Sequence, residues 1–472
     1  MENWQGKKIT ILGLGKSAYA AAKYLKQHGA AVLVSENGQL KDDQLIWAQE
    51  LKNLGVEIED GGHSRKAIEQ ADLIVTSPGI PPSSSVIQSA RILHKEIICD
   101  IELAYRESNV PIIAVTGTNG KSTTTALISH ILEFNSIKAP ACGNIGSAVM
   151  DYIQNEDITD RRGGSKSYLV MEVSSYQLYY TNTFAPYIAV WLNLTPDHLD
   201  WHGSMEEYIA AKDKILGKNT MAVLNMDDAI VSKRPVGTRF TEPVRARFME
   251  AAFPFSLESN LNTKDPAAFL ENGWLCYRQN GNTHKVIAEK EMPIIGRHNI
   301  ENTLAAIAVA AIVGLSAEQI SNALKKFKAL AHRLEYVDIV NGIACYNDSK
   351  ATNPESAIKA LQAFKEKIVL IAGGKDKGTN LDEFSDNVRS HTAAVILIGE
   401  AKDRFEKAFK KAGVENIHFA STLAEAVDLG LQLKLGPLVL SPACASYDMF
   451  KNFEQRGDVF KKLIRAQSKV NA

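Results

Sequence analysis

The 472-residue chain has an ordinary globular composition, with 45% apolar residues, 23% charged residues and a formal net charge of −1. The balanced charge argues against nucleic acid as a partner, and no run approaches the roughly 18 apolar residues that span a bilayer. The five cysteines stand singly, which argues against a disulfide framework or a zinc cluster. With no secretory leader pattern in the first residues, we expect a cytoplasmic protein. At roughly 150 residues per domain, the length predicts about three domains.

The first predicted domain, residues 1–99, starts with a strand over 8–12, a Gly-rich turn over 13–18, a helix to about 27 and a strand over 31–35. This order predicts a Rossmann-like βαβ fold. The turn would let a phosphate approach the helix N-terminus, and Glu36 could bind a ribose. A dinucleotide oxidoreductase is therefore one hypothesis, and a tight turn without a ligand is another. A later strand over 72–77 ends in a Pro-Gly turn at the edge where α/β sheets bind ligands.

The second predicted domain, residues 100–329, contains a Gly-rich loop between an apolar strand over 111–114 and a helical segment over 125–132. Such a loop binds phosphates with its backbone N–H groups, a lysine ammonium and a hydroxyl that can ligate Mg²⁺. The general pattern has a Gly six residues before its Lys, where this chain has Val115. The loop thus predicts that the chain binds ATP. Its departure from the general pattern indicates a narrower family than the P-loop proteins as a whole. Its residues are Gly117, Thr118, Asn119, Gly120, Lys121, Ser122 and Thr123.

Two polar positions follow later strands of this domain. Glu172 stands near the end of an apolar run over 168–173, as a metal-holding carboxylate beside a phosphate loop would, and the alternative is a charge that reaches solvent. His198 follows the run over 187–192 at the same predicted edge.

Asn and Gly pairs at 272–273 and 281–282 predict hairpins in a small β subregion, and helices are predicted over 303–313 and 317–327.

The third predicted domain, residues 330–472, is a second doubly wound α/β unit. Strands are predicted over 343–347, 367–372, 394–398 and 437–440, with polar loops over 348–354, 373–378 and 441–446. Loops that follow parallel strands meet at one edge of the sheet. Their lysines could bind a carboxylate-bearing substrate, and the alternative is solvated surface lysines.

Together these motifs resemble the Mur ligase family over nearly the whole chain. The loop over 117–123, Glu172, the Asp197-His198 pair and the His298-Asn299-x-x-Asn302 segment resemble the superfamily, which includes folylpolyglutamate synthases. The segments 348–354 and 441–457 resemble the members that add D-glutamate, and the Asn-Pro-Arg signature of the diamino-acid-adding members is missing.

The resemblance implies three domains: a Rossmann-like UDP-sugar domain, a central P-loop-type ATPase domain with a mostly parallel sheet, and a C-terminal Rossmann-like domain for the amino acid. It implies a monomeric cytoplasmic enzyme that adds D-glutamate to UDP-N-acetylmuramoyl-L-alanine through an acyl phosphate, in peptidoglycan synthesis. It favours UDP over NAD at the first Gly-rich turn. The end of the second strand, Ser35-Glu36-Asn37, differs from the Asp-Thr-Arg that some relatives have there. This is the position where the family would contact the uridine.

The resemblance also implies the site residues. The implied catalytic residues are Lys121, Glu172, His198 and Lys212. Two Mg²⁺ ions would be held by Ser122, Glu172, His198 and a carbamylated Lys212. Without the family match, an exposed helix lysine is at least as good an interpretation of Lys212. ATP would also contact Asn299, Asn302, Arg333 and Asp348. The UDP-sugar would contact Gly13, Leu14, Gly15, Lys16, Ser17, Ser77, Gly79, Asn144, Ser174 and Gln177. D-glutamate would contact Lys350, Thr352, Lys377, Ser446 and Phe453, with Lys375 as the alternative to Lys377.

Three rival hypotheses remain at this point. A folylpolyglutamate synthase would share the ATP site but act on folate. A dinucleotide oxidoreductase rests on the first Gly-rich turn and Glu36 and leaves the second Gly-rich loop unexplained. An ATP-binding regulatory protein would require the acid, histidine and lysine positions to be coincidental.

Overall fold

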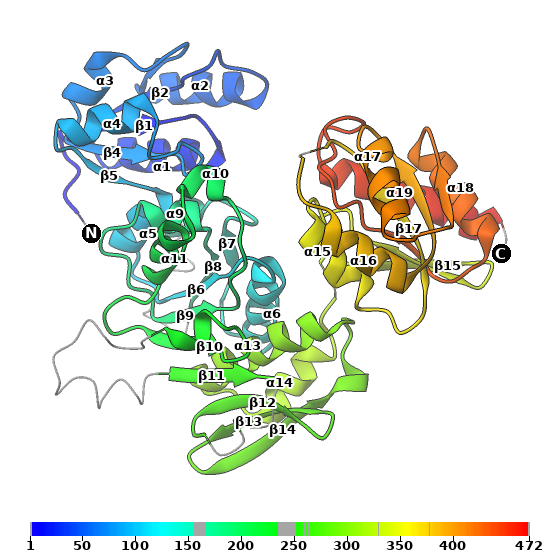
Figure 1. Cartoon of the computed structure of the whole chain (residues 1–472). Helices are drawn as coiled ribbons and strands as arrows, with labels where there is room; N and C mark the ends of the chain where they lie inside the picture. The colour runs from blue at the N-terminus through cyan, green and yellow to red at the C-terminus, as the bar shows by residue number, and fades with distance from the viewer. Residues whose placement is uncertain are drawn as a thin grey trace. The chain divides into compact units, whose positions relative to one another are not determined.

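The computed structural model describes residues 2–154, 167–234, 252–257, 261, 264–328, 330–376 and 378–470 (Figure 1). The chain divides into two compact units, one formed by Met1–Lys290 with Glu301–Leu324 and the other by Glu291–Ile300 with Lys325–Ala472. No helix within the described ranges is both long and apolar enough to cross a membrane. The first unit contains two sheets and the second unit contains one.

The N-terminal sheet is parallel, with five strands in the order β3-β2-β1-β4-β5. The predicted strands over 8–12 and 31–35 are confirmed, because runs of Val, Ile and Leu are buried between helices on both faces of the sheet. Its strands are β1 (Lys8–Leu12), β2 (Ala31–Ser35), β3 (Glu57–Glu59), β4 (Leu73–Thr76) and β5 (Glu96–Ile98), and its helices are α1 (Lys16–Gln27), α2 (Asp43–Asn53), α3 (Arg65–Glu69) and α4 (Ser85–Ile92).

The central sheet has nine strands in the order β14-β13-β12-β11-β10-β9-β6-β8-β7. From β12 to β7 neighbouring strands are parallel, and β12, β13 and β14 form antiparallel hairpins. The strands are β6 (Ile112–Thr116), β7 (Ala141–Gly143), β8 (Leu169–Glu172), β9 (Ile188–Trp191), β10 (Met221–Asn225), β11 (Ala252–Ser256), β12 (Ala267–Glu271), β13 (Trp274–Gln279) and β14 (Asn282–Ala288). The predicted small β subregion is confirmed.

The hairpin turns of this subregion have the backbone that Asn and Gly favour. Asn272 and Gly273 have φ of 50° and 74°, and Asn280 and Gly281 have φ of 54° and 77°, as two-residue hairpin turns require. The second turn therefore lies one residue earlier than the predicted 281–282, because Asn282 already begins β14.

Helices flank the central sheet, and one of them begins earlier than predicted. They are α5 (Asp100–Glu107), α6 (Lys121–Phe134), α7 (Val149–Ile153), α9 (Ser175–Tyr179), α10 (Leu199–His202), α11 (Met205–Asp213), α13 (Arg297–Val313) and α14 (Ala317–Leu324), with 3₁₀ turns at Val231–Lys233 and Glu289–Glu291. The predicted start of α13 at 303 is wrong, because Gly296, with φ of 103°, ends the preceding loop and the polar residues after it are already helical. The predicted end of the next helix at 327 is also wrong, since α14 ends at Leu324.

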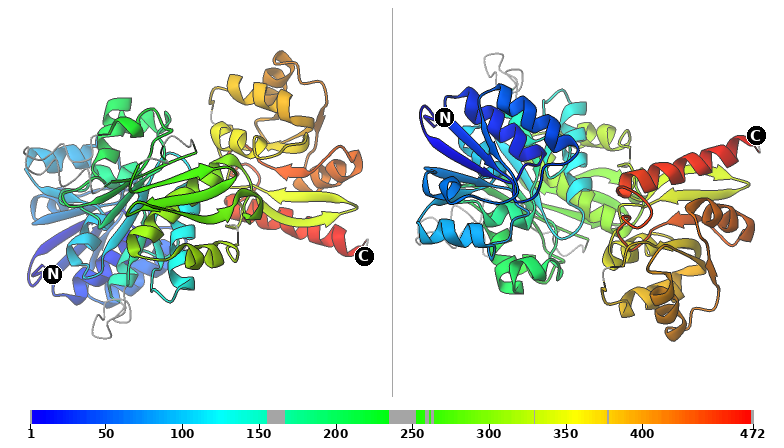
Figure 2. Two further views of the ribbon diagram at one scale, coloured as in Figure 1. Left: turned by 90° about the horizontal axis from the view of Figure 1, so that it is seen from below. Right: turned by 90° about the horizontal axis from the view of Figure 1, so that it is seen from above.

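The second unit contains a six-stranded sheet in the order β15-β16-β20-β17-β18-β19, parallel except for the β15–β16 hairpin. Its strands are β15 (Glu335–Val340), β16 (Ile343–Asn347), β17 (Ile368–Gly373), β18 (Thr392–Ile398), β19 (Ile417–Phe419) and β20 (Leu438–Leu440). Its helices are α15 (Pro354–Leu361), α16 (Asp382–His391), α17 (Lys402–Lys411), α18 (Leu423–Leu433) and α19 (Phe453–Val470). The long helix α19 runs along β15 and β16 (Figure 2). The predicted second doubly wound sheet is confirmed, with one antiparallel edge strand.

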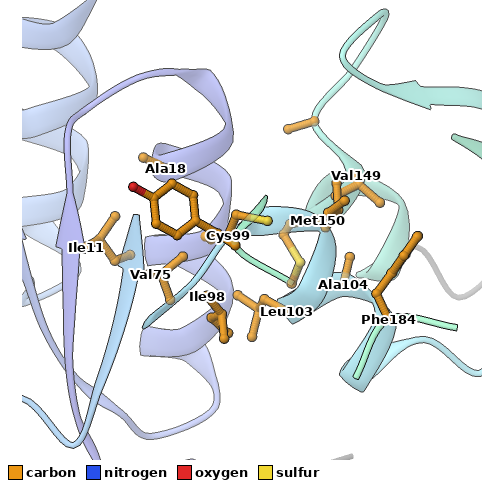
Figure 3. Packing of buried hydrophobic residues seen from close by; sticks show 14 of the residues in the cluster. Ile11, Ala18, Val75, Ile98, Cys99, Leu103, Ala104, Val149, Met150 and Phe184 are labelled. Carbon is orange, nitrogen blue, oxygen red and sulfur yellow. The ribbon is translucent and has the colours of Figure 1, made fainter. Parts of the chain in front are cut away.

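One buried cluster of apolar side chains connects the two sheets of the first unit. Figure 3 shows Ile11 and Val75 of the N-terminal sheet, Leu103 of α5 and Met150 of α7 in this continuous core. Each of these side chains is at most 2% exposed. Helix α5 thus packs in the core that the two sheets share. The domain boundary at 99–100 remains a prediction.

Glu102 of α5 holds the loop after α9 through its fully buried carboxylate. The carboxylate accepts backbone N–H bonds from Asn182, Thr183 and Phe184 at 3.0 Å each, and it also accepts the Thr183 hydroxyl. Arg106, one helical turn on, pairs with it at 2.9 Å. Because this charge satisfies several buried donors at once, removing it would leave them all unpaired.

We expect Glu102→Ala to lower the free energy of unfolding by at least about 3 kcal/mol, measured by urea denaturation. Glu69→Gln serves as the control, since its pair with Arg65 lies on the surface, with the arginine side chain 88% exposed. Loss of such a surface pair should change stability by less than about 1 kcal/mol. Equal effects of the two substitutions would contradict the structural role of Glu102.

Candidate functional site

The second Gly-rich loop has the geometry of a phosphate cradle. It connects β6 to α6, and Gly120, with φ of 83°, occupies the position before the first helical residue. Glycine suits this position because other residues rarely adopt its left-handed backbone conformation, and a Cβ there would also crowd the side-chain amide oxygen of Asn302. The Ser122 side chain is buried at the helix N-terminus, where the helix dipole favours anions.

The segment after β9 fixes the shape of this loop. Asn193 accepts the N–H of Asn119 at 2.9 Å and donates to its carbonyl at 3.1 Å. Thr118 accepts the N–H of Thr195 at 3.0 Å through its hydroxyl, which also lies 3.1 Å from the hydroxyl of Tyr208. Asn193 and Tyr208 could not be selected from the sequence, because their partners in the loop lie far away along the chain.

Two lysines converge on the carbonyl of Gly117. Lys121 donates to the Gly117 and Thr118 carbonyls at 2.9 and 2.7 Å, and Lys212 donates to the Gly117 carbonyl at 2.9 Å and to the Thr116 hydroxyl at 3.2 Å. Lys212 is 1% exposed, so the alternative of an exposed helix lysine is wrong. Burial, with Lys121 nearby, holds the pKa of Lys212 well below its usual range.

Glu172 is buried at the end of β8, so the alternative of a charge reaching solvent is wrong. Its Oε1 accepts the side-chain N–H of Asn144 at 3.0 Å. Its Oε2 is buried and has no hydrogen-bond partner in the described part of the chain. An ionised oxygen without a partner is costly in a protein interior, so this atom has the properties expected of a ligand for a cation.

His198 lies before α10 in a left-handed backbone conformation, with φ of 55°. Its Nε2 is 3.3 Å from the Asp197 carboxylate, and its ring packs on Tyr176 with 4.8 Å between centroids. Burial lowers the pKa of His198, against the raising effect of Asp197. Lys121 and Lys212 also lower this pKa, which places the histidine within electrostatic range of both lysines.

No group of three or more His, Cys, Asp or Glu side chains among the residues described is arranged to hold a metal ion. The predicted metal set of Ser122, Glu172, His198 and Lys212 therefore offers fewer than three such ligands by itself. Mg²⁺ there would need further oxygen ligands from the nucleotide or from a modified lysine.

The first Gly-rich turn is closed by a carboxylate. Glu36 accepts the N–H of Leu14 at 2.8 Å, and Gly13, with φ of 85°, packs against Ser77. Lys16 reaches the carbonyl of Gly146 at 2.9 Å, beside the predicted substrate residue Asn144. A carboxylate on the Leu14 N–H repels a phosphate at that point, so the predicted diphosphate contact there requires Glu36 to move.

A buried acid, Asp100, links two predicted substrate segments. Gln177 donates to it at 3.2 Å. Burial raises the pKa of Asp100, against the lowering effects of Gln177 and Ser17. Gln177 in turn accepts from the N–H and hydroxyl of Ser174 at 3.1 Å, in a capping box on α9. The Gln177 amide is therefore engaged within the protein, and its partner Asp100 was not singled out from the sequence.

In the second unit the predicted nucleotide residue Asp348 is buried. It accepts the Ser441 hydroxyl at 2.7 Å and the N–H of Leu334 at 3.1 Å. Burial raises the pKa of Asp348 to about 7. Arg333 and Asn299 belong to the same unit, whereas Asn302 lies in the first unit and contacts α6 through Thr124 at 3.2 Å.

The predicted D-glutamate residues of the second unit follow its strands. Lys350 places its ammonium 5.4 Å from the centre of the Phe453 ring, Ser446 is buried, and Thr352 lies in the turn before α15. Lys375 is ion-paired with Glu400 at 2.6 Å, which disfavours it as the substrate lysine. Lys377 lies outside the described residues.

His202 is a buried histidine that sequence reasoning missed. Its Nε2 lies 2.9 Å from the Ser175 hydroxyl and its side chain packs against Tyr208. Its Nδ1 is buried without a hydrogen-bond partner among the residues described. Burial, with His198 and Lys212 nearby, lowers the pKa of His202 to about 4.

We expect His202 to make the fold acid-labile. The unfolded chain protonates it near pH 6.5 and the folded chain only near 4, so the free energy of unfolding falls as pH falls between these values, by roughly 3 kcal/mol. His202→Gln should flatten this part of the curve in urea titrations at pH 7, 6 and 5. His94→Asn, at an exposed position, is the control and should leave the slope unchanged; a slope unaffected by His202→Gln would refute the assignment.

Comparison with known proteins places the whole chain in one family. Three family models match: the "Mur ligase MurD-like, N-terminal domain" over residues 7–99, the "Mur ligase middle domain" over 115–310, and the "Mur ligase, glutamate ligase domain" over 332–442. A UDP-N-acetylmuramoylalanine--D-glutamate ligase of Thermoanaerobacter sp. (strain X514) is 40% identical over 98% of each chain. A protein of the same name from Pelotomaculum thermopropionicum is 38% identical over 99% of this chain and 100% of its own.

Solved structures agree on the fold. The UDP-N-acetylmuramate-alanine ligase of Thermotoga maritima matches over 97% of this chain and 99% of its own, with a TM-score of 0.56 and 19% identity. A folylpolyglutamate synthase of Mycobacterium tuberculosis matches over 76% of this chain and 92% of its own, with a TM-score of 0.54 and 14% identity. At these identities the likeness concerns the fold alone. With three matching domain models and full-length relatives at 38% and 40% identity, the chain belongs to the Mur ligase family.

Proposed function

We propose that this protein is the ATP-dependent ligase that joins D-glutamate to UDP-N-acetylmuramoyl-L-alanine in peptidoglycan precursor synthesis. The observation that carries the proposal is the full-length match, at 40% identity, to a relative named as that ligase. The phosphate loop and its two lysines agree with an ATP-dependent reaction. A folate acceptor and a dinucleotide cofactor find no comparable support.

A carboxylate is a poor electrophile, so ATP would phosphorylate the alanyl carboxylate of the UDP-sugar and the D-glutamate amine would displace phosphate from the acyl phosphate. The protein's task in both steps is to position the reactants and neutralise charge. Lys121 extends over the loop carbonyls and would exchange them for the phosphate oxygens of ATP. The loop residues 117–123 would donate N–H groups to the same phosphates.

The residues around the loop fit Mg²⁺. The unpartnered Oε2 of Glu172 supplies a buried anionic oxygen, and the buried Ser122 hydroxyl supplies a neutral one. Bound Mg²⁺ would neutralise phosphate charge at this edge of the sheet. Asn144 would hold Glu172 in place, and His198 and Lys212 would serve a second ion.

Lys212 has the environment that carbamylation requires. Only an unprotonated amine attacks CO₂, forming an N–C bond and releasing a proton, and burial favours the unprotonated form of Lys212. The product is an anionic oxygen ligand where an ammonium could not bind a cation. We therefore propose that Lys212 is carbamylated in the active enzyme.

The substrate-binding segments are proposed from the same geometry. Lys16, Ser17 and Asn144 lie along the path from the first Gly-rich turn to Glu172, where the UDP-sugar would bind. In the second unit Lys350 and Lys377 would bind the D-glutamate carboxylates, and Ser446 and Thr352 would donate hydrogen bonds.

Phosphate release from ATP and Mg²⁺ with UDP-N-acetylmuramoyl-L-alanine tests the function. We expect release with D-glutamate and not with L-glutamate, D-alanine or a diamino acid, because the third-domain loops select the amino acid. The amide product is identified by its mass. Release with none of these amino acids, in a folded protein that binds ATP, would overturn the proposal and direct the search to folate-type acceptors.

Replacement of Lys212 tests the modification. Lys212→Ala should lower activity at least about 100-fold, and millimolar acetate or propionate should restore part of it by supplying the missing anionic oxygen. Lys212→Arg is the matched control: it keeps a positive charge and fills the space, so carboxylates should not rescue it. Rescue of neither variant, or of both, would argue against a carbamate at this position.

A further inference from the structure

Arg456 is among the largest fully buried side chains of the second unit, with 1% of its surface exposed. It lies in the first turn of α19 and donates hydrogen bonds to two loops. Nε and Nη2 bind the hydroxyl and carbonyl of Ser349 at 2.9 and 2.8 Å. Nη2 and Nη1 bind the carbonyls of Cys444 and Ala445 at 3.1 and 3.3 Å.

This buried guanidinium forms no ion pair within the described part of the chain, and the carboxylates of Asp348 and Asp448 lie near enough to favour its charged form. Burial lowers its pKa to about 10, so it remains charged at neutral pH. Removing this charge from water is costly even with carboxylates nearby, and well-packed apolar residues often replace buried charges without loss of stability. The requirements of the fold therefore do not by themselves explain an arginine here.

Each anchor of Arg456 adjoins a proposed D-glutamate contact. Ser349 precedes Lys350, and Ala445 precedes Ser446. The Ser349 hydroxyl donates to the carbonyl of Phe453 at 2.8 Å. The loop after β17 is held by the same carbonyl of Ala445, which accepts the backbone N–H of Lys375 at 2.9 Å. The guanidinium thus joins the loops that follow β16 and β20, and the loop after β20 in turn holds the loop after β17.

We propose that Arg456 is the positioning residue of the D-glutamate subsite: its planar guanidinium fixes the loops after β16 and β20, the second of which holds the loop after β17, and its positive charge favours the dianionic amino acid that binds over them. This inference rests on the proposed function. Arginine suits the role because its fork of donors holds three carbonyls and a hydroxyl at fixed angles, which a lysine cannot do.

Steady-state kinetics of Arg456→Met and Arg456→Lys test the inference. We expect the methionine variant to raise the KM for D-glutamate at least about 10-fold, while the KM for UDP-N-acetylmuramoyl-L-alanine changes less than about 3-fold. The lysine variant keeps the charge but loses the fork, so its KM for D-glutamate should lie between those of wild type and Arg456→Met. Added guanidinium, but not methylammonium, should lower the KM of Arg456→Ala.

Lys461→Met is the matched control, because Lys461 lies on the same helix but is paired with Glu335 and Asp458. It should leave the KM for D-glutamate at the wild-type value. Equal increases in both KM values for Arg456→Met, or no increase, would overturn the inference. If Arg456→Met does not fold, the lysine variant and the guanidinium rescue decide, and failure of both to show the D-glutamate effect overturns it. Wild-type enzyme that does not use D-glutamate would instead refute the proposed function.

Discussion

The convergence of Lys121 and Lys212 on one backbone carbonyl is the constraint around which the first unit is organised. Two ammonium groups beside the Gly117 carbonyl repel each other, and one of them is fully buried. The protein relieves this repulsion by favouring the uncharged form of Lys212, which burial and Lys121 both promote. The same repulsion makes the loop receptive to anions, because phosphate or a carbamate would convert it into attraction.

The backbone around the lysines is arranged so that this charge distribution is in place before a ligand arrives. Asn193 holds the loop through the backbone N–H and carbonyl of Asn119. Two side chains one turn apart on α11, Tyr208 and Lys212, also contact the loop. On the opposite side Asn144 orients Glu172 and leaves its second oxygen unpartnered. Preorganised dipoles and charges of this kind need little rearrangement during reaction, which is the main source of electrostatic catalysis.

The sequence predicted the elements and the loops between them far better than it predicted the contacts across the fold. The strands over 8–12, 31–35 and 343–347 were predictable because most of their residues are apolar and turn residues follow them. The start of α13 was not, because the polar side chains after Gly296 resemble a loop in sequence. Asp100, Asn193 and His202 were not selected because their role depends on partners such as Gln177 and Ser175, which only the tertiary structure brings to them.

Fully buried basic side chains occur in both units, although the chain as a whole has a net charge of only −1. Lys212 in the first unit and Arg456 in the second are each 1% exposed and donate to neutral oxygens. The two differ in how they meet the cost of burial, since an amine can lose its proton whereas a guanidinium keeps it at neutral pH. Lys212 is thereby suited to chemical modification, whereas Arg456 provides a permanent positive charge. Both arrangements fit a ligase whose substrates bring phosphates and carboxylates, because basic groups attract anionic substrates.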